Sequence, residues 1–347
     1  MYIATYTASA NIAVVKYWGK RNEELILPYN NSLSFTMDDN LQTITTVMFS
    51  EKFSQDELWL NGKKMDLQKG KKSHVLPVDL LRKKADIDLP VRIVSKNCFP
   101  TGAGFASSAS GVAALVCATS KALNLTLSGK ELSMLARQGS GSASRSVYGG
   151  FVEWLKGDLE DGTDSFAQQI APHDHWPELR NVIAVVETEE KKVSSRHGMK
   201  TTTLTSALYE KRLQYLEGVI PKMKEAVLQK DFATFAELTM RESNSMHASM
   251  LDTWPPIMYL SDGSREVIYM VEDLNAELGK TVAGYTFDAG PNAHIYTTEE
   301  YESVIKERLE KIAHVKNIEV CKVGQGPQQI SDEAQFLIDP QNGEPRL

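Results

Sequence analysis

The sequence contains no apolar run that approaches the roughly 18 residues needed to span a membrane. Residues 1–10 also lack the basic start and apolar centre of a secretory signal peptide. Cysteine is scarce: Cys98, Cys117 and Cys321 are odd in number, lie far apart and form no CxxC pair. Such a set does not support a disulfide framework. We therefore expect a cytoplasmic protein with no membrane partner, whose cysteines are reduced thiols in the core.

An excess of positive charge is missing too. Lysine and arginine total 38 against 45 aspartates and glutamates, which gives a formal net charge of −7. This balance argues against a partner that is a nucleic acid or a membrane surface. An anionic ligand would need positive charge supplied locally. The 347 residues are 42% hydrophobic and 24% charged, an ordinary composition for a globular protein with two domains of roughly 150–200 residues each.

Strand-like and helix-like segments follow one another irregularly, with no internal repeat and no low-complexity linker. Alternation and apolar runs predict strands at Leu41–Phe49, Pro90–Ser95 and Asn181–Glu187, a hairpin over Glu57–Met65 that turns at Asn61-Gly62, and two strands between Ala283 and Thr297. Capping residues and periodicity predict helices from Ser107 or Ser108 to Leu123, from the capping box Ser128–Glu131 to Gln138, over Thr203–Gln229 and Arg265–Leu278, and around Met246 and Met250 as core residues. This mixed order favours an α+β protein over a doubly wound sheet. We place a domain boundary near residue 185, which gives domains 1–185 and 186–347.

The stretch PTGAGFASSASGVAAL, Pro100 to Leu115, joins a predicted strand to a predicted helix. Its glycines and serines would present backbone N–H groups and the positive end of a helix to a phosphate. It is not a Walker A loop, since no Gly-Lys-Ser/Thr follows, and Ala106 and Ser107 interrupt a dinucleotide GxGxxG pattern. Small-residue loops are common before helices, so a tight structural turn remains an alternative to a phosphate site.

Three other segments combine basic residues with hydroxyl groups. NIAVVKYWGKR (Asn11–Arg21) gathers three basic residues around an aromatic pair and a glycine. RQGSGSASRSVYGG (Arg137–Gly150) alternates glycine and serine ahead of Arg145, whose guanidinium can bind a carboxylate or phosphate through two hydrogen bonds. KKVSSRHGM (Lys191–Met199) adds a third such segment. Each alone is also explained as a solvated basic turn, whereas three in a net-acidic chain favour a site for a ligand of high negative charge.

A lone acidic residue stands out in YTFDAGPNAHIYT (Tyr285–Thr297), where Asp288 lies between a predicted strand and Gly290-Pro291. A carboxylate there could orient or deprotonate a hydroxyl, and nearby cationic segments would keep it ionised. An aspartate that only stabilises an Asx turn is the alternative. By contrast, His173 and His175 have no third ligand at a recognisable spacing, and we expect no zinc site there.

Taken together, these segments resemble the diphosphomevalonate decarboxylases, ATP-dependent enzymes of the GHMP kinase superfamily. The resemblance rests on NIAVVKYWGKR, LPYNNSLSFTMDD, FPTGAGFASSASG, RQGSGSASRSVYGGFVEW and YTFDAGPNA, and extends through IAPHDHWPELR, KKVSS and DTWPPI over roughly residues 5–300. One departure is Thr101-Gly102-Ala103-Gly104, where the family usually has Thr-Ala-Ala-Gly; the extra glycine removes no contacting group. The resemblance implies the GHMP kinase fold, with a ribosomal-protein-S5-like N-terminal domain, a ferredoxin-like C-terminal domain, a site in the cleft between them and a homodimer.

The reaction that the resemblance implies begins with transfer of phosphate from ATP to the tertiary 3-hydroxyl of 5-diphosphomevalonate. Phosphate then leaves with CO₂, and isopentenyl diphosphate forms. Mg²⁺ would be held largely by phosphate oxygens and Ser108, since no dedicated acidic cage is visible. A phosphomevalonate decarboxylase and a mevalonate 3-kinase would keep most of these motifs. Outside enzymes, the alternative is an inactive ligand-sensing or scaffold protein on the same fold.

The resemblance also implies roles for individual residues. Catalysis would involve Asp288, Arg145, Lys20 and Ser108, with Asp288 facing the 3-hydroxyl and Arg145 holding the substrate carboxylate. The substrate would contact Asn11, Tyr17, Trp18, Gly19, Lys20, Ser140, Gly141, Ser142, Ala143, Ser144, Arg145, Ser195 and Arg196. ATP would contact Lys16, Ser95, Pro100, Gly102, Ala103, Gly104, Ala106, Ser107 and Ser108.

Overall fold

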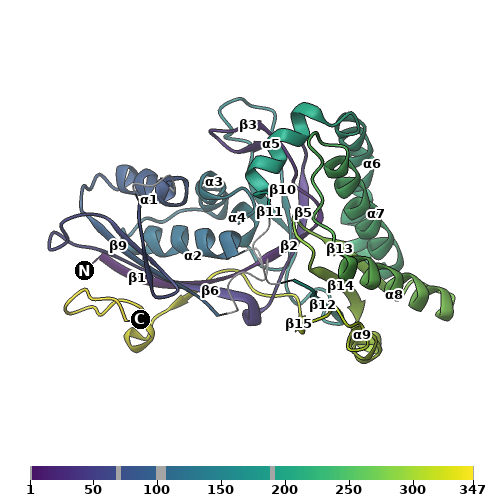
Figure 1. Ribbon diagram of the computed structural model, residues 1–347. Helices are drawn as coiled ribbons and strands as arrows, with labels where there is room; N and C mark the ends of the chain where they lie inside the picture. Colours follow the sequence, from purple (N-terminus) through teal and green to yellow (C-terminus); the bar gives the residue numbers. More distant parts are fainter. Residues whose placement is uncertain (1, 68–71, 99–106, 188–191, 347) are drawn as a thin grey trace.

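A mixture of packed sheets and helices makes up the protein in a computed structural model, which describes residues 2–67, 72–98, 107–187 and 192–346. The largest sheet has the strand order β16-β1-β6-β9-β7-β8. Its strands are β1 (Tyr2–Ser9), β6 (Gln42–Phe49), β7 (Glu57–Leu60), β8 (Lys63–Met65), β9 (Val91–Asn97) and β16 (Gln328–Ile330). Figure 1 shows α1 (Lys72–Lys84), α2 (Ser107–Ala122) and α3 (Gly129–Gly139) on one side of this sheet. The alternating sequence of β6 and the turn at Asn61-Gly62, where both residues have positive φ, confirm the predicted strand and hairpin.

The helix α2 packs directly on β1 and β6. It is rich in alanine, and Ala113, Ala114 and Ala118 are fully buried, which lets the helix backbone lie close to the sheet. The predicted capping box of α3 is present, because Ser128 accepts from the Glu131 N–H and Glu131 bonds back to the Ser128 N–H. The start of α2 and the C-terminal end of α3 come close together, since the hydroxyls of Ser108 and Ser140 are 3.4 Å apart.

Two four-stranded sheets make up most of the remaining core. One has the order β11-β10-β5-β2 and the other β13-β14-β12-β15. Their strands are β2 (Asn11–Val15), β5 (Ser32–Thr36), β10 (Phe151–Trp154), β11 (Ala167–Ala171), β12 (Leu179–Val185), β13 (Ala283–Phe287), β14 (Ala293–Thr298) and β15 (Asn317–Cys321). An edge-to-face aromatic contact joins the two sheets, with the ring centroids of Phe35 and Tyr296 5.4 Å apart, and Phe235 of the helix Phe232–Leu251 packs on the same Tyr296 ring at 5.1 Å.

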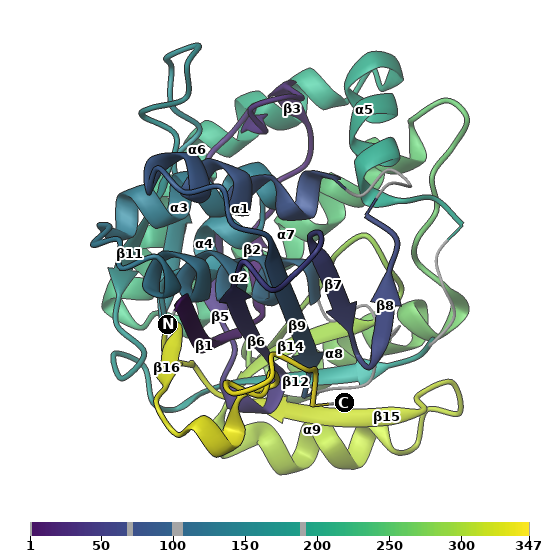
Figure 2. The ribbon, with the colours of Figure 1, turned by 90° about the vertical axis from the view of Figure 1, so that its left-hand side faces the viewer.

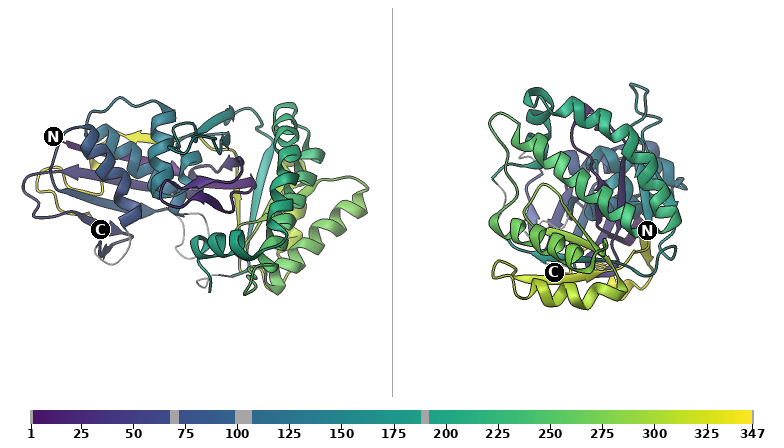
Figure 3. Two further views of the ribbon diagram at one scale, coloured as in Figure 1. Left: turned by 90° about the horizontal axis from the view of Figure 1, so that it is seen from above. Right: turned by 90° about the vertical axis from the view of Figure 1, so that its right-hand side faces the viewer.

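Long helices cover these sheets: α6 (Tyr209–Gln229), α7 (Phe232–Leu251) and α8 (Asp262–Leu278). In the left panel of Figure 3 these green helices lie at the opposite end of the molecule from the blue α1 and α2. The smaller elements are β3 (Lys20–Asn22), β4 (Leu27–Pro28), α4 (Ala143–Ser146), α5 (Ser195–Thr205), α9 (Glu302–Leu309) and the 3₁₀ turns Asp39–Leu41, Glu299–Tyr301 and Glu333–Gln335. Within the described ranges, no helix is both long and apolar enough to cross a membrane.

The helix α7 touches both smaller sheets, through β2 and β13. A Cβ on Gly284 of β13 would come within 2.7 Å of the Ala236 side chain on α7, so the two elements approach closely because both residues are small. The strand β16 pairs antiparallel with β1, and Figure 2 shows it in yellow beside that strand. The fold therefore joins distant parts of the sequence at two places: α7 contacts β2, and β16 pairs with β1. The division into domains 1–185 and 186–347 stays a prediction.

Two expectations from the sequence are wrong. The predicted helix Thr203–Gln229 is two helices, α5 and α6, because Asp252 accepts hydrogen bonds from the Ser206 hydroxyl and the Leu208 N–H and holds the link between them. Cys98 is exposed rather than buried, since it lies just beyond the end of β9; Cys117 and Cys321 are buried as expected, and all three are free thiols. The expected core helix around Met246 and Met250 is α7, where both methionines are buried.

Candidate active site

The end of β2 and the end of β13 meet at an ion pair. Lys16, the first residue after β2, places its Nζ 2.6 Å from Oδ1 of Asp288, which follows β13. The two residues are 272 positions apart. The lysine side chain is only 2% exposed, whereas the carboxylate is 40% exposed and faces the open side of the pair. Asp288 can therefore contact a ligand on its exposed side while the buried Lys16 fixes the carboxylate on the other side.

Charge controls the protonation state of Asp288. Burial acts to raise the pKa of its carboxyl, but the charge and hydrogen bond of Lys16, together with the charges of His294 and Arg145, outweigh burial. The resulting pKa lies below the usual range for aspartate. Asp288 is therefore a carboxylate at neutral pH, able to accept a hydrogen bond from a hydroxyl.

Arg145 lies buried beside this pair and is held by two fixed contacts. Its Nε donates to Oδ1 of Asn11 at 3.2 Å, and Nη1 donates to the Ser32 hydroxyl at 2.6 Å. Burial lowers the pKa of the guanidinium to about 10, and the charge of Asp288 opposes that effect. One N–H of Nη1 and both of Nη2 have no partner among the described residues, which leaves the outer edge of the fork for a ligand.

Asn11 connects Arg145 to the glycine-serine loop. Its side-chain amide donates to the Ser142 carbonyl at 3.0 Å and to the Ser146 hydroxyl at 2.7 Å. The sequence placed Asn11 among the substrate contacts, but its amide groups are used to fix the loop and the guanidinium. The Ser144 hydroxyl is likewise turned inward, donating to the Gly141 carbonyl at 2.7 Å.

Tyr17 brings an unused hydroxyl to the same place. The hydroxyl is buried and has no hydrogen-bond partner in the described part of the chain. Burial raises the pKa of Tyr17 well above its ordinary value, against the opposing charges of Arg145 and Arg196. A Cβ on Gly141 would come within 2.7 Å of the Tyr17 ring, so only glycine lets the loop approach the ring this closely. The free O–H is a donor for an anionic oxygen.

The turn after Tyr17 requires glycine. Gly19 has φ of +103°, and a side chain there would also overlap Tyr209. The Tyr209 hydroxyl in turn donates to the Trp18 carbonyl at 2.5 Å, while the buried Trp18 ring packs edge-on against Tyr259. Trp18 and Gly19 therefore shape the turn that delivers the next residue, Lys20. The buried Nζ of Lys20 lies 2.6 Å from Glu23, whose side chain is 46% exposed.

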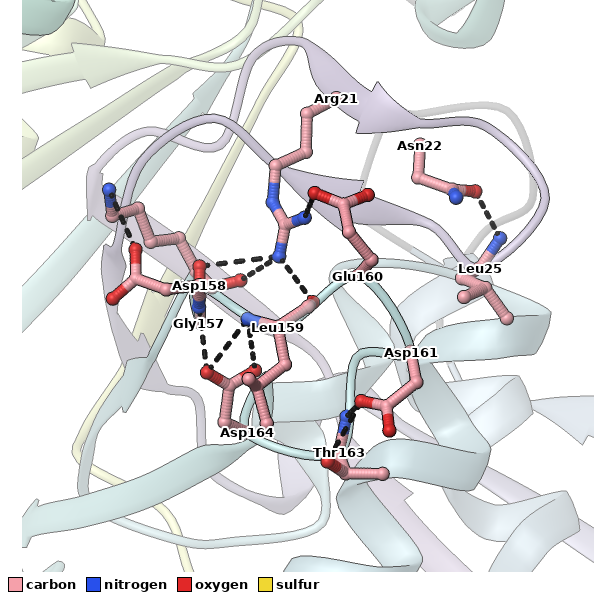
Figure 4. Close-up of polar contacts among 11 residues, drawn as sticks. Arg21, Asn22, Leu25, Gly157, Asp158, Leu159, Glu160, Asp161, Thr163 and Asp164 are labelled. Carbon is pink, nitrogen blue, oxygen red and sulfur yellow. Dashed lines mark hydrogen bonds and ion pairs between the residues drawn. The ribbon is translucent and has the colours of Figure 1, made fainter.

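A rigid loop anchors the hairpin that carries Lys20 (Figure 4). Nη2 of Arg21 donates to the backbone carbonyls of Lys156, Gly157 and Leu159, at 3.4, 3.3 and 3.1 Å. The loop keeps those carbonyls in place because Asp164 accepts from the N–H groups of Asp158 and Leu159, at 2.7 and 3.1 Å. Asp161 and Asp164 stabilise turns in this loop, and Arg21 binds its carbonyl groups and pairs with Glu160 rather than facing the site.

Hydroxyl groups from two helices meet at the other side of the site. The Ser140 hydroxyl lies 3.4 Å from that of Ser108 and 3.3 Å from that of Ser142. Ser107 and Ser108 are exposed at the start of α2, and the backbone N–H groups at the N-terminal end of a helix can bind an anion. The other predicted ATP contacts Pro100, Gly102, Ala103, Gly104 and Ala106 lie outside the described residues. Ser95 is buried and bonded to the Thr45 hydroxyl at 2.9 Å.

The third basic segment also reaches the site. Ser194 caps α5, so Ser195 and Arg196 form its first turn, and the charge of Arg196 acts on Tyr17. The structure thus brings residues from all the predicted segments that it describes around Lys16, Arg145 and Tyr17. Ala143 is buried in α4 and contributes to the packing of the loop. No group of three or more histidine, cysteine, aspartate or glutamate side chains that could hold a metal occurs among the described residues.

Several residues of the site were not singled out from the sequence. Ser32, which fixes Arg145, falls within the stretch LPYNNSLSFTMDD, but it lies in the fully buried strand β5 and looks like a core position. Arg212 and Glu242 lie behind Lys16 on separate helices and belong to no motif. What marks Arg212 and Glu242 as unusual is that they are charged residues buried on the apolar faces of their helices. Burial is known only once the fold is known, so the sequence alone could not single them out.

The three sheets with their helices, and the basic residues gathered beside the start of α2, agree with the GHMP kinase fold, and comparison with known proteins shows the same. Residues 8–167 match the family described as diphosphomevalonate decarboxylase-like N-terminal domain, and residues 181–335 match the mevalonate 5-diphosphate decarboxylase C-terminal domain. The chain belongs to the diphosphomevalonate decarboxylase family.

Relatives support this assignment over almost the whole length. The diphosphomevalonate decarboxylase of Candida albicans is 46% identical, over 96% of this chain and 99% of its own. That of Aspergillus fumigatus is 48% identical, over 90% and 81%. A crystal structure of a mevalonate 5-diphosphate decarboxylase superposes with a TM-score of 0.88 at 38% identity, covering 99% of this chain and 100% of that one. A second, described as MDDEF in complex with MVAPP, AMPPCP and magnesium, gives a TM-score of 0.86 at 38% identity, covering 94% and 98%.

Proposed function

We propose that this protein uses ATP to decarboxylate 5-diphosphomevalonate, forming isopentenyl diphosphate, ADP, phosphate and CO₂. The observation that carries the proposal is the carboxylate of Asp288, paired with Lys16 at 2.6 Å and placed next to the buried guanidinium of Arg145. The reaction needs a fixed base-like group at a hydroxyl and a cation for the neighbouring carboxylate, and this arrangement supplies both. The related structure with MVAPP, AMPPCP and magnesium supports the same pair of substrates.

The diphosphate of the substrate would bind where hydroxyl groups and basic side chains gather. Tyr17 offers its unpartnered hydroxyl, and Arg196 lies near it. Lys20 would exchange the exposed carboxylate of Glu23 for a phosphate oxygen. The remaining contacts would come from Ser140, Gly141, Ser142 and Ser195. This set gives positive charge without a basic surface, in agreement with the net-acidic chain.

ATP would place its phosphates at the start of α2, against Ser107 and Ser108. The distance between the Ser108 and Ser140 hydroxyls, 3.4 Å, means that this helix end borders the substrate loop. Mg²⁺ would be held by phosphate oxygens and the Ser108 hydroxyl, and when bound it would neutralise charge on the transferring phosphoryl group. A ligand set made of phosphates fits a site whose described residues offer hydroxyls rather than a carboxylate cluster.

Asp288 would accept the hydrogen bond of the 3-hydroxyl and aim its oxygen at the γ-phosphorus. The new P–O bond forms as the bond between the γ-phosphorus and the bridging oxygen of ADP breaks, and the hydroxyl proton passes to Asp288. Because the pKa of Asp288 is low, the carboxylate is a weak base at rest, and proton transfer is expected late, when the hydroxyl oxygen is already bonded to phosphorus.

Arg145 would hold the substrate carboxylate through the first step. In the second, the C–O bond to the new phosphate breaks and phosphate departs with that electron pair. The electrons of the C–C bond to the carboxylate then form the alkene, and CO₂ is released. The rigid contacts of Arg145 with Asn11 and Ser32 keep the carboxylate in place until the bond breaks.

Product analysis tests the proposal. ADP, CO₂ and alkene release would be measured with mevalonate carrying no, one or two phosphates. We expect rapid release of all three products only from the diphosphate. Turnover of the monophosphate alone, ADP without CO₂, or no turnover at all would each replace the proposal by one of the alternatives. The homodimer and the cytoplasmic location stay predictions.

A further inference from the structure

A buried ion pair lies directly behind the site, on two helices that take no part in the chemistry. Arg212 of α6 and Glu242 of α7 are bonded through Nη2 and Oε1. Their side chains are 1% and 0% exposed. Neither residue can reach a ligand, because Lys16 lies between the pair and Asp288.

Apart from the bond between its two members, the pair contacts the backbone of Lys16. Nη2 of Arg212 donates to the Lys16 carbonyl at 3.3 Å, and Asn30 donates to the same oxygen at 3.1 Å. The Lys16 backbone also acts on the Glu242 carboxyl and lowers its pKa. Lys16 is the first residue beyond β2, and the pairing of β2 with β5 already shifts register between Ala13 and Val15. Residue 16 therefore lies outside the regular pairing of the sheet, and its carbonyl is held by Arg212 of the ion pair and by Asn30.

The pair is a poor device for stability alone. Burial raises the pKa of Glu242, against the opposing charges of Arg212 and Lys16. Three of its polar atoms, Nε and Nη1 of Arg212 and Oε2 of Glu242, are buried without a hydrogen-bond partner in the described part of the chain. Buried ion pairs are often no more stabilising than apolar residues of similar volume, and unsatisfied atoms add a cost. A role other than stability is therefore indicated.

We propose that Arg212 and Glu242 are positioning residues, which hold Lys16 by its backbone so that its ammonium group stays on Asp288. Charges alternate along the row Arg212, Glu242, Lys16, Asp288. If the pair is lost, Lys16 moves, and Asp288 loses the partner that fixes its position and charge. This inference rests on the proposed function only for its kinetic readout.

The test replaces the pair by apolar residues in the double variant Arg212→Met with Glu242→Leu, which leaves no unpaired charge. We expect the variant to fold, with thermal unfolding close to that of the wild type. Its kcat with diphosphomevalonate should fall about 10- to 100-fold, the scale of a small misplacement of reacting groups, while KM for ATP changes little. The control is Arg180→Met with Glu302→Leu, which removes a buried arginine and its partly exposed glutamate partner away from the site, and it should leave kcat unchanged.

A second readout does not need turnover. The Asp288 carboxyl would be titrated by ¹³C NMR in the ligand-free protein, with Asp288→Asn to assign its signal. The charged or titratable groups that interact with Asp288 are Lys16, Arg145, His294, His247 and Tyr296, and of these only Lys16 is held by the proposed pair. We expect the midpoint to move to higher pH in the double variant. Wild-type kcat and an unchanged midpoint would overturn the inference, whereas an inactive wild type would contradict the proposed function instead.

The milder variant Arg212→Lys decides the matter if the double variant does not fold. A lysine can pair with Glu242, but its single compact ammonium group cannot also take over the fixed geometry of the guanidinium at the Lys16 carbonyl. We expect the same two changes at smaller size. If both readouts match the wild type, the pair has no positioning role.

Discussion

At the scale of single residues, Lys16 explains why the partly buried carboxylate of Asp288, at the end of β13, stays charged. Its Nζ contacts Asp288 at 2.6 Å, and its charge and hydrogen bond, together with the charges of His294 and Arg145, lower the pKa of Asp288 against the effect of burial. A group with a lowered pKa stays ionised down to a lower pH than usual, so any activity that needs the carboxylate is lost only as the pH falls through that lowered value.

Lys16→Met should reverse this. With the lysine gone, burial remains and the pKa of Asp288 rises. The acid limb of the kcat–pH profile should then move to higher pH, and kcat at neutral pH should fall. The phosphates of both substrates titrate identically in variant and wild type, so the difference between the two profiles reports the protein. Lys311→Met, at an exposed surface pair, should leave the profile unchanged; a Lys16→Met profile that coincides with the wild type would contradict the pairing.

Arg145 is the residue at which shape matters as much as charge. Arg145→Lys keeps a positive charge but cannot bind Asn11 and Ser32 at once while presenting a fork to a carboxylate. We expect kcat to fall at least about 10-fold, because orientation of the substrate carboxylate is lost, with folding retained. Steady-state kinetics beside thermal unfolding would measure this. Lysine working as well as arginine would mean that a point charge is sufficient.

At the scale of elements, the hairpin of β3 and β4 carries Lys20 at the site, and the loop at residues 156–164 fixes this hairpin through its contacts with Arg21. Arg21→Ala should loosen the hairpin and raise KM for diphosphomevalonate severalfold, since the lost contacts are worth about 1 kcal/mol each, with kcat changed by less than about 2-fold because Arg21 touches no reacting group. The control is Arg241→Ala, an exposed arginine paired on α7. A KM equal to that of the wild type, measured under the same conditions, would show that the hairpin needs no anchor.

The elements also show which parts of the fold are encoded locally. The strand β6, the β7–β8 turn and the capped helix α3 follow from alternation, an Asn-Gly pair and a capping box, and the structure confirms them. The break between α5 and α6 could not be predicted, because the carboxylate that holds it comes from Asp252, 46 positions away from Ser206. Helical periodicity runs through such a break and carries no sign of it.

At the scale of the whole molecule, the site exists because distant segments meet. The glycine-serine loops, the basic turn and the Asp288 turn are each visible as local patterns, so candidate residues could be chosen from the sequence. The partnership of Lys16 with Asp288 could not, because it depends on α7 bringing β2 and β13 together. Arg212 and Glu242 were missed for the same reason: their contacts, and not their neighbours in sequence, give them a role.

The central claim is that Asp288 acts on the substrate hydroxyl, and the variant Asp288→Asn tests it most directly. Asparagine is nearly isosteric and can still hydrogen-bond, so the variant should fold and bind both substrates, as measured by calorimetry. It cannot accept the hydroxyl proton, and kcat should fall by about 10²-fold or more, the scale of losing a positioned acid–base group. Near-normal kcat would contradict the account, and lost binding or a lowered melting temperature would instead assign Asp288 a structural role in its turn.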